Sequence, residues 1–117
     1  MASVIISIAR QFSRFPGGRS ASDGPASAEE FREALLVPAI CEAEKSGERV
    51  TVSLDGTLGY AASFLEEAFG GLVRVDGFTA ERLREVMSVS SVDVPDYAAE
   101  AMRYVVEADD ARKGSDE

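Results

Sequence analysis

A strand-like run followed closely by a helical one is the feature that most constrains the fold. Residues 49–55 (RVTVSLD) alternate apolar and polar side chains, as a half-buried strand does. A loop at 56–62 with two glycines then leads to residues 63–72 (SFLEEAFGGL). The apolar residues of that second run, Leu65, Ala68, Phe69 and Leu72, recur at helical spacing. A strand joined to a helix across a short loop predicts an α/β domain.

Both ends of the helix at 63–72 carry recognisable signals. Ser63, followed three residues later by Glu66, has the form of a capping box. Gly70 and Gly71 each cost about 1 kcal/mol inside a helix relative to alanine. The two glycines therefore either end the helix or allow it to pack closely against the sheet.

The rest of the chain continues the alternation of strands and helices. Strands are expected near 4–8 and 88–92, with a weaker one at 19–21 and a short extended stretch at 73–75. Helices are expected at 28–46, which Pro38 should kink, at 80–87, and from Asp93 onward. Ser27 and Thr79 are expected to cap the first two of these helices.

This order predicts an α/β single domain, with a mixed or mostly parallel sheet of about four strands and about four helices. The chain has 117 residues, of which 45% are hydrophobic, enough for one ordinary core. We expect the domain to span residues 1–108. Residues 109–117 are charged and lack apolar anchors, and they are expected to form a flexible tail.

Composition argues against several kinds of site. The chain has no histidine and one cysteine, Cys41, which excludes histidine bases, an internal disulfide and a multi-cysteine zinc site. We expect Cys41 to be a small buried apolar residue in a reducing cytosol. No apolar run approaches the ~20 residues of a membrane span, and the start of the chain lacks the basic lead of a signal peptide. A soluble cytoplasmic protein with no metal or other cofactor is therefore expected.

Charge is spread unevenly along the chain. The net charge is −9, yet the first 22 residues contain Arg10, Arg14 and Arg19 and no acidic residue. The remaining residues hold nine basic and 21 acidic side chains. Such an acidic surface repels phosphates at long range, so we do not expect the protein to bind nucleic acid.

The basic segment allows two interpretations. The first is a solvated loop in which Pro16 and two glycines form a turn. The second is a site for a phosphate, a nucleotide or another anion. Its residues would be Arg14, Gly17, Gly18, Arg19 and the helix start at Ser63. The Gly-Arg loop and the loop that leads to Ser63 each follow a predicted strand. In parallel sheets, functional loops gather at the carboxyl ends of the strands.

Several short strings of residues together resemble the STAS-like family of unknown function. They are Phe12-Ser13, Pro16-Gly17-Gly18-Arg19, Asp23-Gly24-Pro25, Glu30-Phe31-Arg32, Val37-Pro38-Ala39 and the run from Ser63 to Arg74. The resemblance covers roughly residues 3–108. It implies kinship with the STAS domains of sulfate transporters and anti-sigma factor antagonists, which are small α/β domains.

The resemblance also implies a regulatory site. In the antagonists, a kinase-like partner phosphorylates a serine at the start of the helix after a central strand, which releases a sigma factor. The position that corresponds by order is Ser63. The antagonists carry Asp-Ser-Ser-Gly there, whereas this chain has Ala61-Ala62-Ser63-Phe64. A plain helix cap is therefore the alternative role for Ser63.

The function implied is a non-enzymatic regulatory module of prokaryotic signalling that binds another protein. Its partner would be a GHKL-type ATPase or kinase, or a transcription regulator. The alternatives are a small-ligand site at the Gly-Arg loop and an inhibitor whose acidic surface mimics nucleic acid. An enzyme is not expected. The carboxylates near the loop are Asp55, Glu66 and Glu67, and no histidine or nearby lysine could activate a nucleophile.

Overall fold

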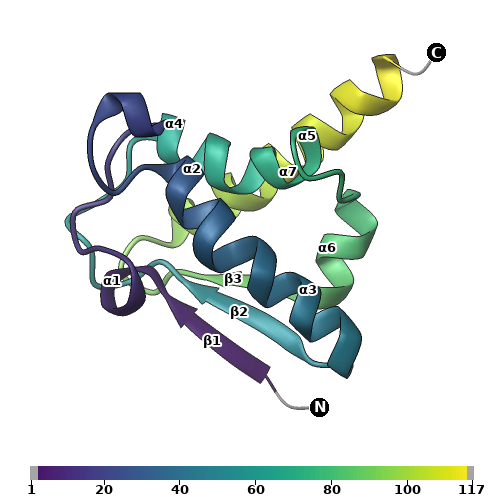
Figure 1. Ribbon diagram of the computed structural model, residues 1–117, viewed down its shortest axis with the longest axis horizontal. Helices are drawn as coiled ribbons and strands as arrows, with labels where there is room; N and C mark the ends of the chain where they lie inside the picture. The colour runs from purple at the N-terminus through teal and green to yellow at the C-terminus, as the bar shows by residue number, and fades with distance from the viewer. Residues whose placement is uncertain (1–2, 116–117) are drawn as a thin grey trace.

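The frame of the molecule is a three-stranded parallel sheet (Figure 1). The computed structural model describes residues 3–115. The strands β1 (Ser3–Ser7), β2 (Arg49–Ser53) and β3 (Met87–Ser90) lie side by side in the order β1-β2-β3. Their register aligns Ile5 with Thr51 and Thr51 with Ser88. A sheet that grows in one direction through right-handed crossovers carries all its connecting helices on one face.

Two crossovers and a C-terminal helix form the layer that covers this face. The first crossover consists of α2 (Ala28–Phe31), the π-helical turn η2 (Arg32–Leu36) and α3 (Val37–Ser46). The second consists of α4 (Ala62–Leu65), the π-helical turn η3 (Glu66–Gly70), α5 (Gly71–Arg74) and α6 (Ala80–Val86). The long helix α7 (Pro95–Ser115) packs against η3, α5 and β3. Between β1 and α2 lie the short helix α1 (Ile8–Gln11) and the 3-10 turn η1 (Ala21–Asp23).

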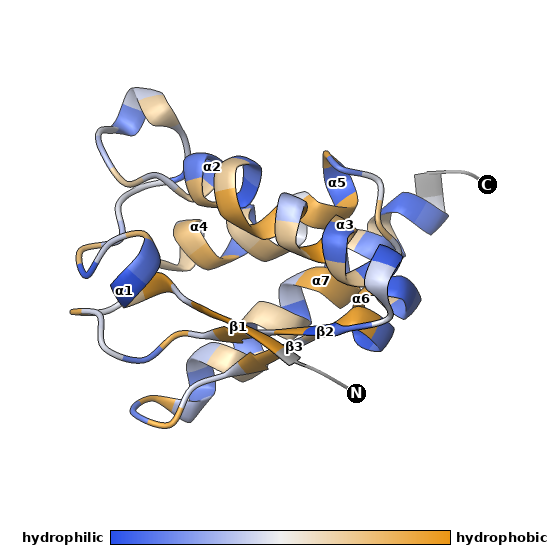
Figure 2. Ribbon diagram, turned by 60° about the horizontal axis from the view of Figure 1, so that its bottom comes forward, coloured by the Kyte–Doolittle hydropathy of each residue, from blue (hydrophilic) through white to orange (hydrophobic). Residues whose placement is uncertain are grey.

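The two faces of the sheet have different surroundings. Val50, Val52 and Met87 point into the core, where each is at most 2% exposed. Figure 2 shows that apolar residues are concentrated in the strands and in the middle of the helical layer. On the opposite face, Ile5 is 65% exposed and the neighbouring Thr51 is only half-buried. The hydrophobic core therefore lies on one side of the sheet alone.

The predicted α/β fold is confirmed, with differences in the number of strands. The strand at β2 and its buried face match the sequence pattern. The weak strand expected at 19–21 is instead a bend that leads into η1, because the Asp23 carboxylate accepts the Ser20 N–H at 3.0 Å and closes a local turn. The extended stretch expected at 73–75 is also wrong, since α5 runs through Arg74. These changes leave three strands, all parallel.

The first helical run keeps the predicted limits and contains an irregular turn before its proline. Ser27 is the N-cap, and its hydroxyl accepts the Glu30 N–H at 3.1 Å. The helix then continues without a break from Ala28 to Ser46, with η2 directly ahead of α3. Pro38 lacks the N–H that the Ala34 carbonyl would accept in a regular helix, which accounts for the π-helical turn there. Cys41 lies exposed on α3, so the prediction that it is buried was wrong.

The later helices begin close to their predicted positions. The Thr79 hydroxyl accepts the Arg82 N–H at 3.1 Å and caps α6, as expected. Helix α7 begins at Pro95 and continues to Ser115, so the charged segment from 109 onward is helical in its described part. Asp109 is buried there and forms ion pairs with Arg112 and Lys113. Over residues 3–115, no helix combines the length and the apolar character needed to cross a membrane.

Candidate functional site

Three loops that follow the strands meet at the carboxyl end of the sheet. The loop after β1 begins beyond α1, which Ser7 caps by accepting the Arg10 N–H at 3.2 Å. Phe12 then anchors the loop, with its ring 5.5 Å from that of the buried Phe31. The loop beyond Phe12 runs to the edge of the molecule.

Hydrogen bonds tie this loop to the loops after β2 and β3. The Leu58 N–H donates to the Arg14 carbonyl at 3.0 Å, which joins the first two loops. The Asp55 carboxylate accepts the N–H groups of Val92 and Asp93, each at 2.9 Å, which joins the second loop to the third. One backbone hydrogen bond and one side-chain carboxylate thus fix the positions of the three loops.

Two tyrosines, Tyr60 and Tyr97, hold the loop after β2 in place. The Tyr60 hydroxyl donates to the Leu54 carbonyl at 2.9 Å, and its ring meets the Tyr97 ring edge to face at 5.1 Å. Burial raises the pKa of Tyr60 to about 12, so the phenol remains a neutral hydrogen-bond donor. The loop therefore rests on a rigid aromatic base.

Apolar side chains project from these fixed loops into solvent. We call the four of them the carboxyl-end rim: Phe15, Leu58, Val92 and Val94. Their exposed fractions are 66%, 78%, 78% and 41%. Two arginines, Arg10 on α1 and Arg14 on the loop that follows it, are exposed and form no ion pair within the described residues. The rim is thus apolar with basic neighbours, on a molecule that is acidic as a whole.

The glycines of the predicted anion site belong to a self-contained turn. The Gly17 N–H donates to the Ala26 carbonyl at 2.8 Å, and the Gly18 carbonyl accepts the Ala28 N–H at 2.9 Å. A Cβ at Gly17 would lie 2.4 Å from the Pro25 carbonyl oxygen, so this turn closes only around a glycine. These two polar groups of the turn are therefore occupied by the protein itself.

The other predicted site residues are separated. Arg14 lies beside the rim, whereas the Arg19 guanidinium bonds Glu66 and lies 3.5 Å from Glu67. Ser63 is half-buried as the second residue of α4. Ala61, not Ser63, is the N-cap of α4, so the predicted capping box is wrong.

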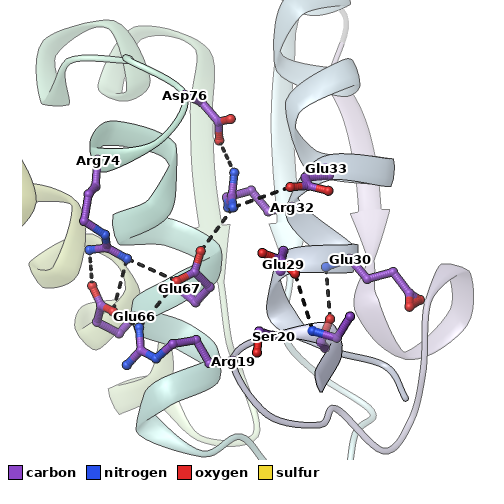
Figure 3. Close-up of polar contacts among 12 residues, drawn as sticks. Arg19, Ser20, Glu29, Glu30, Arg32, Glu33, Glu66, Glu67, Arg74 and Asp76 are labelled. Atoms are coloured by element: carbon purple, nitrogen blue, oxygen red, sulfur yellow. Dashed lines mark hydrogen bonds and ion pairs between the residues drawn. The ribbon is translucent and has the colours of Figure 1, made fainter. Parts of the chain in front are cut away.

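Arg19 is part of an extended ion-pair cluster that lies between the helical segments containing η2 and η3 (Figure 3). Its members are Arg19, Arg32, Glu33, Glu66, Glu67, Arg74 and Asp76. Arg74 bonds Glu66 at 2.6 Å and Glu67 at 3.2 Å. Burial favours a higher pKa for the Glu66 carboxyl, but the hydrogen bonds and charges of Arg74 and Arg19 hold it below its usual range. Three cations thus pair with four carboxylates.

Arg32 is the buried centre of this cluster. It is 1% exposed and donates to Asp76 at 2.6 Å and to Glu67 at 3.1 Å. A Cβ at Gly71 would lie only 2.7 Å from the Arg32 Nε atom. Gly71 is therefore required because it leaves room for the guanidinium. The close packing expected of the glycine pair occurs, but at Gly71 it is against Arg32 rather than against the sheet.

The sequence interpretation missed both the rim and the centre of the cluster. Leu58 and Phe15 are single apolar residues within turn-rich loops. An isolated apolar residue in such a loop was the one sequence signal that could have indicated the rim. Arg32 gave no signal, because Asp76 lies 44 positions away in the chain. Across the described residues, no group of three His, Cys, Asp or Glu side chains is placed to hold a metal ion.

Comparison with known protein families identifies a match for the chain. The profile of the family described as the STAS-like domain of unknown function matches residues 27–97. No curated protein and no solved structure matches the chain. The matched region runs from the cap of α2 into the first turn of α7 and covers more than half of the chain. It includes the ion-pair residue Arg32, the rim loop at Leu58 and Ser63, but not the Gly-Arg loop. The chain therefore belongs to the STAS-like family of unknown function.

Proposed function

We propose that this domain is a non-enzymatic regulatory module that binds a protein partner through the carboxyl-end rim. The observation that carries the proposal is the exposure of Phe15, Leu58 and Val92 on loops that hydrogen bonds hold in place. Exposed apolar side chains on a fixed surface lose little conformational entropy when a partner covers them. Membership of a STAS-like family supports the same function, since STAS antagonists act by binding other proteins.

The charges around the rim favour a partner that presents acidic residues. Arg10 and Arg14 are free of ion pairs within the described residues, whereas Arg19, Arg32 and Arg74 are paired inside the cluster. Opposite charge at the edge of an interface speeds association and sets the orientation of docking. The partner we propose is a GHKL-type ATPase or kinase, or a transcription regulator, with an apolar patch bordered by carboxylates.

Ser63 is the proposed switch position within this function. It lies in the first turn of α4, directly after the loop that carries Leu58. A phosphate there would meet the positive end of the helix dipole and would add charge next to the docking surface. Phosphorylation is therefore expected to be tolerated by the fold and to weaken binding of the partner.

The alternative function, a site for a nucleotide or another anion, has less support. Of its two arginines, Arg19 is engaged by Glu66 and Glu67, and an anion would have to displace these carboxylates. The turn groups of Gly17 and Gly18 are also bonded to the protein. Protein binding at the rim requires no such rearrangement.

Partner capture with matched variants tests the proposal. Tagged wild-type protein is compared with the double variant Phe15→Ser/Leu58→Ser and with the control Val75→Ser. Val75 is 59% exposed but lies at the end of α5, outside the rim. An ATPase, kinase or transcription regulator should co-purify with the wild type and with the control, and not with the rim variant. An identical set of captured proteins for all three would contradict the proposal.

The switch is tested with the same captured partner. Ser63→Glu should weaken its binding at least about tenfold, measured by titration calorimetry, because a charge is added beside the interface. Ser63→Ala should bind like the wild type. If the glutamate variant also binds like the wild type, Ser63 is not the switch, although the rim can still be the docking surface.

A further inference from the structure

The outer edge of β1 is exposed, and over residues 3–115 a side chain caps it only at its carboxyl end, where the Ser7 N–H donates to Gln11 Oε1 at 2.6 Å. Within the described residues, β1 pairs with β2 alone, and Figure 1 shows it at the border of the sheet. Val4 is 41% exposed and Ile5 is 65% exposed. The strand contains no charge and no proline, which are the usual features that keep a sheet edge from pairing with another chain.

The opposite edge of the sheet, β3, also lacks charge and proline, but it is covered by other parts of the chain. Helix α7 packs against β3, and Met87 at the start of that strand is 2% exposed. The next residue, Ser88, is bonded by the Arg49 guanidinium at 2.8 Å. The two edges therefore have different surroundings, and β1 forms the edge that exposes apolar side chains.

We infer that two copies of this chain pair through β1, antiparallel, and form one continuous six-stranded sheet. The strand covers five residues, with Ile5 at its centre. A two-fold axis at Ile5 aligns all five residues of each strand, which no other register achieves. This inference is independent of the proposed function, because the β1 edge and the rim are different surfaces.

The same register covers both exposed apolar side chains. Residues directly opposite each other in an antiparallel pair point to the same face. Ile5 therefore meets Ile5 of the second copy on the open face of the sheet. Val4 meets Ile6 of the second copy on the face that the helices cover. One register thus accounts for the exposure of Val4 and of Ile5.

Charge also favours the antiparallel arrangement. Arg10 follows the carboxyl end of β1, whereas the amino end of β1 lies beside Arg49 in the register, next to Glu48 and the end of α3. The last turns of α3 carry the exposed Glu42 and Lys45, so this end holds both acidic and basic side chains. Antiparallel pairing keeps the two Arg10 residues at opposite ends of the strand pair. Parallel pairing would place the two Arg10 residues together.

Sedimentation velocity over a range of concentrations tests the association. Wild-type protein should form a weak dimer, since a pair of edge strands buries less surface than a standard interface. Ile5→Lys places like charges opposite each other and should raise the dissociation constant at least about tenfold. Val75→Lys, an equally exposed site away from the edge, should leave it unchanged. Circular dichroism confirms that both variants fold. A wild type that stays monomeric at every concentration, or equal dissociation constants for both variants, would overturn the inference.

Disulfide trapping tests the register. In a Cys41→Ser background, Ile5→Cys should crosslink two copies, because opposed residues lie about 4.5–5.5 Å apart, within the reach of a disulfide. Ser7→Cys should not crosslink with itself, because position 7 lies opposite position 3 and about 13 Å from its own copy. Equal crosslinking at the two positions, or none at position 5, would contradict the two-fold axis at Ile5.

Discussion

The ion-pair cluster and the carboxyl-end rim both join segments that are far apart in the sequence, but they use their side chains in opposite ways. In the cluster, the side chains bond one another, and Arg32 is 1% exposed at its centre. In the rim, a backbone hydrogen bond and the Asp55 carboxylate link the loops, and the apolar side chains such as Leu58 make none of these links and face solvent. The difference indicates that the cluster holds the fold together, whereas the rim is available for recognition. Substitutions in the two regions should therefore have very different effects on stability.

Replacement of Arg32 should have the largest effect. Arg32→Met removes the buried cation, which leaves Asp76 without its ion-pair partner and takes one of three arginines from Glu67, and it should lower the free energy of unfolding by about 3 kcal/mol. Urea unfolding followed by circular dichroism measures this change. Arg84→Met is the matched control, because Arg84 is exposed and forms no ion pair within residues 3–115. It should change stability by no more than about 0.5 kcal/mol. Similar losses for the two variants would mean that the cluster has no special role.

Replacement of Gly71 should act through the same guanidinium. The Cβ in Gly71→Ala would lie 2.7 Å from Arg32 Nε and 3.1 Å from Glu67 Oε2, so the ion pair must shift. We expect a loss of about 1–3 kcal/mol in urea unfolding, even though alanine is the better helix former. Gly114→Ala is the control, for which the free energy of unfolding should not fall. Nothing lies within 4 Å of a Cβ at Gly114 in α7, so that variant should be neutral or slightly stabilised. Equal effects of the two alanines would contradict the packing at Gly71.

The features that the sequence predicted correctly are those set by neighbouring residues. The alternation in β2 and the caps at Ser27 and Thr79 depend on side chains within a few positions, and the structure has all three. The cap predicted at Ser63 fails because tertiary contacts of Tyr60 with Leu54 and Tyr97 fix where the chain enters the helix. The N-cap is therefore Ala61, two residues before Ser63, and the helix begins at Ala62.

The site residues that the sequence did not predict depend on distant contacts. Arg32 acquires its role from Asp76 and Gly71, which only the folded chain brings next to it. Arg19 looked like an anion ligand because its carboxylate partners, Glu66 and Glu67, lie more than 40 positions away. Exposure of Leu58 likewise depends on how its loop packs. The spacing of residues along one sequence does not show which distant side chains will be in contact or which will be exposed.

Acid should weaken the cluster through Glu66. The pKa of Glu66 is lowered in the folded protein, so its contribution to stability is fully present above the unfolded value of about 4.3. That contribution is lost as the pH falls through the lower folded pKa. Urea midpoints measured from pH 7 to pH 3 should therefore fall less steeply for Glu66→Gln than for the wild type. Glu85→Gln, at an exposed position of α6, should keep the wild-type slope. Parallel curves for all three proteins would contradict the role of Glu66.

Replacement of Leu58 should have the smallest effect on stability. Leu58 is 78% exposed and its loop is held by its own N–H, which donates to the Arg14 carbonyl. Leu58→Ser keeps that hydrogen bond and removes little buried surface, so the free energy of unfolding should change by no more than about 0.5 kcal/mol in urea. A loss above about 1 kcal/mol would show that the side chain packs against the fold, and the rim would then resemble the cluster. A near-zero change would mean that the fold does not need an apolar side chain at this position, which is expected if the side chain is there to contact a partner.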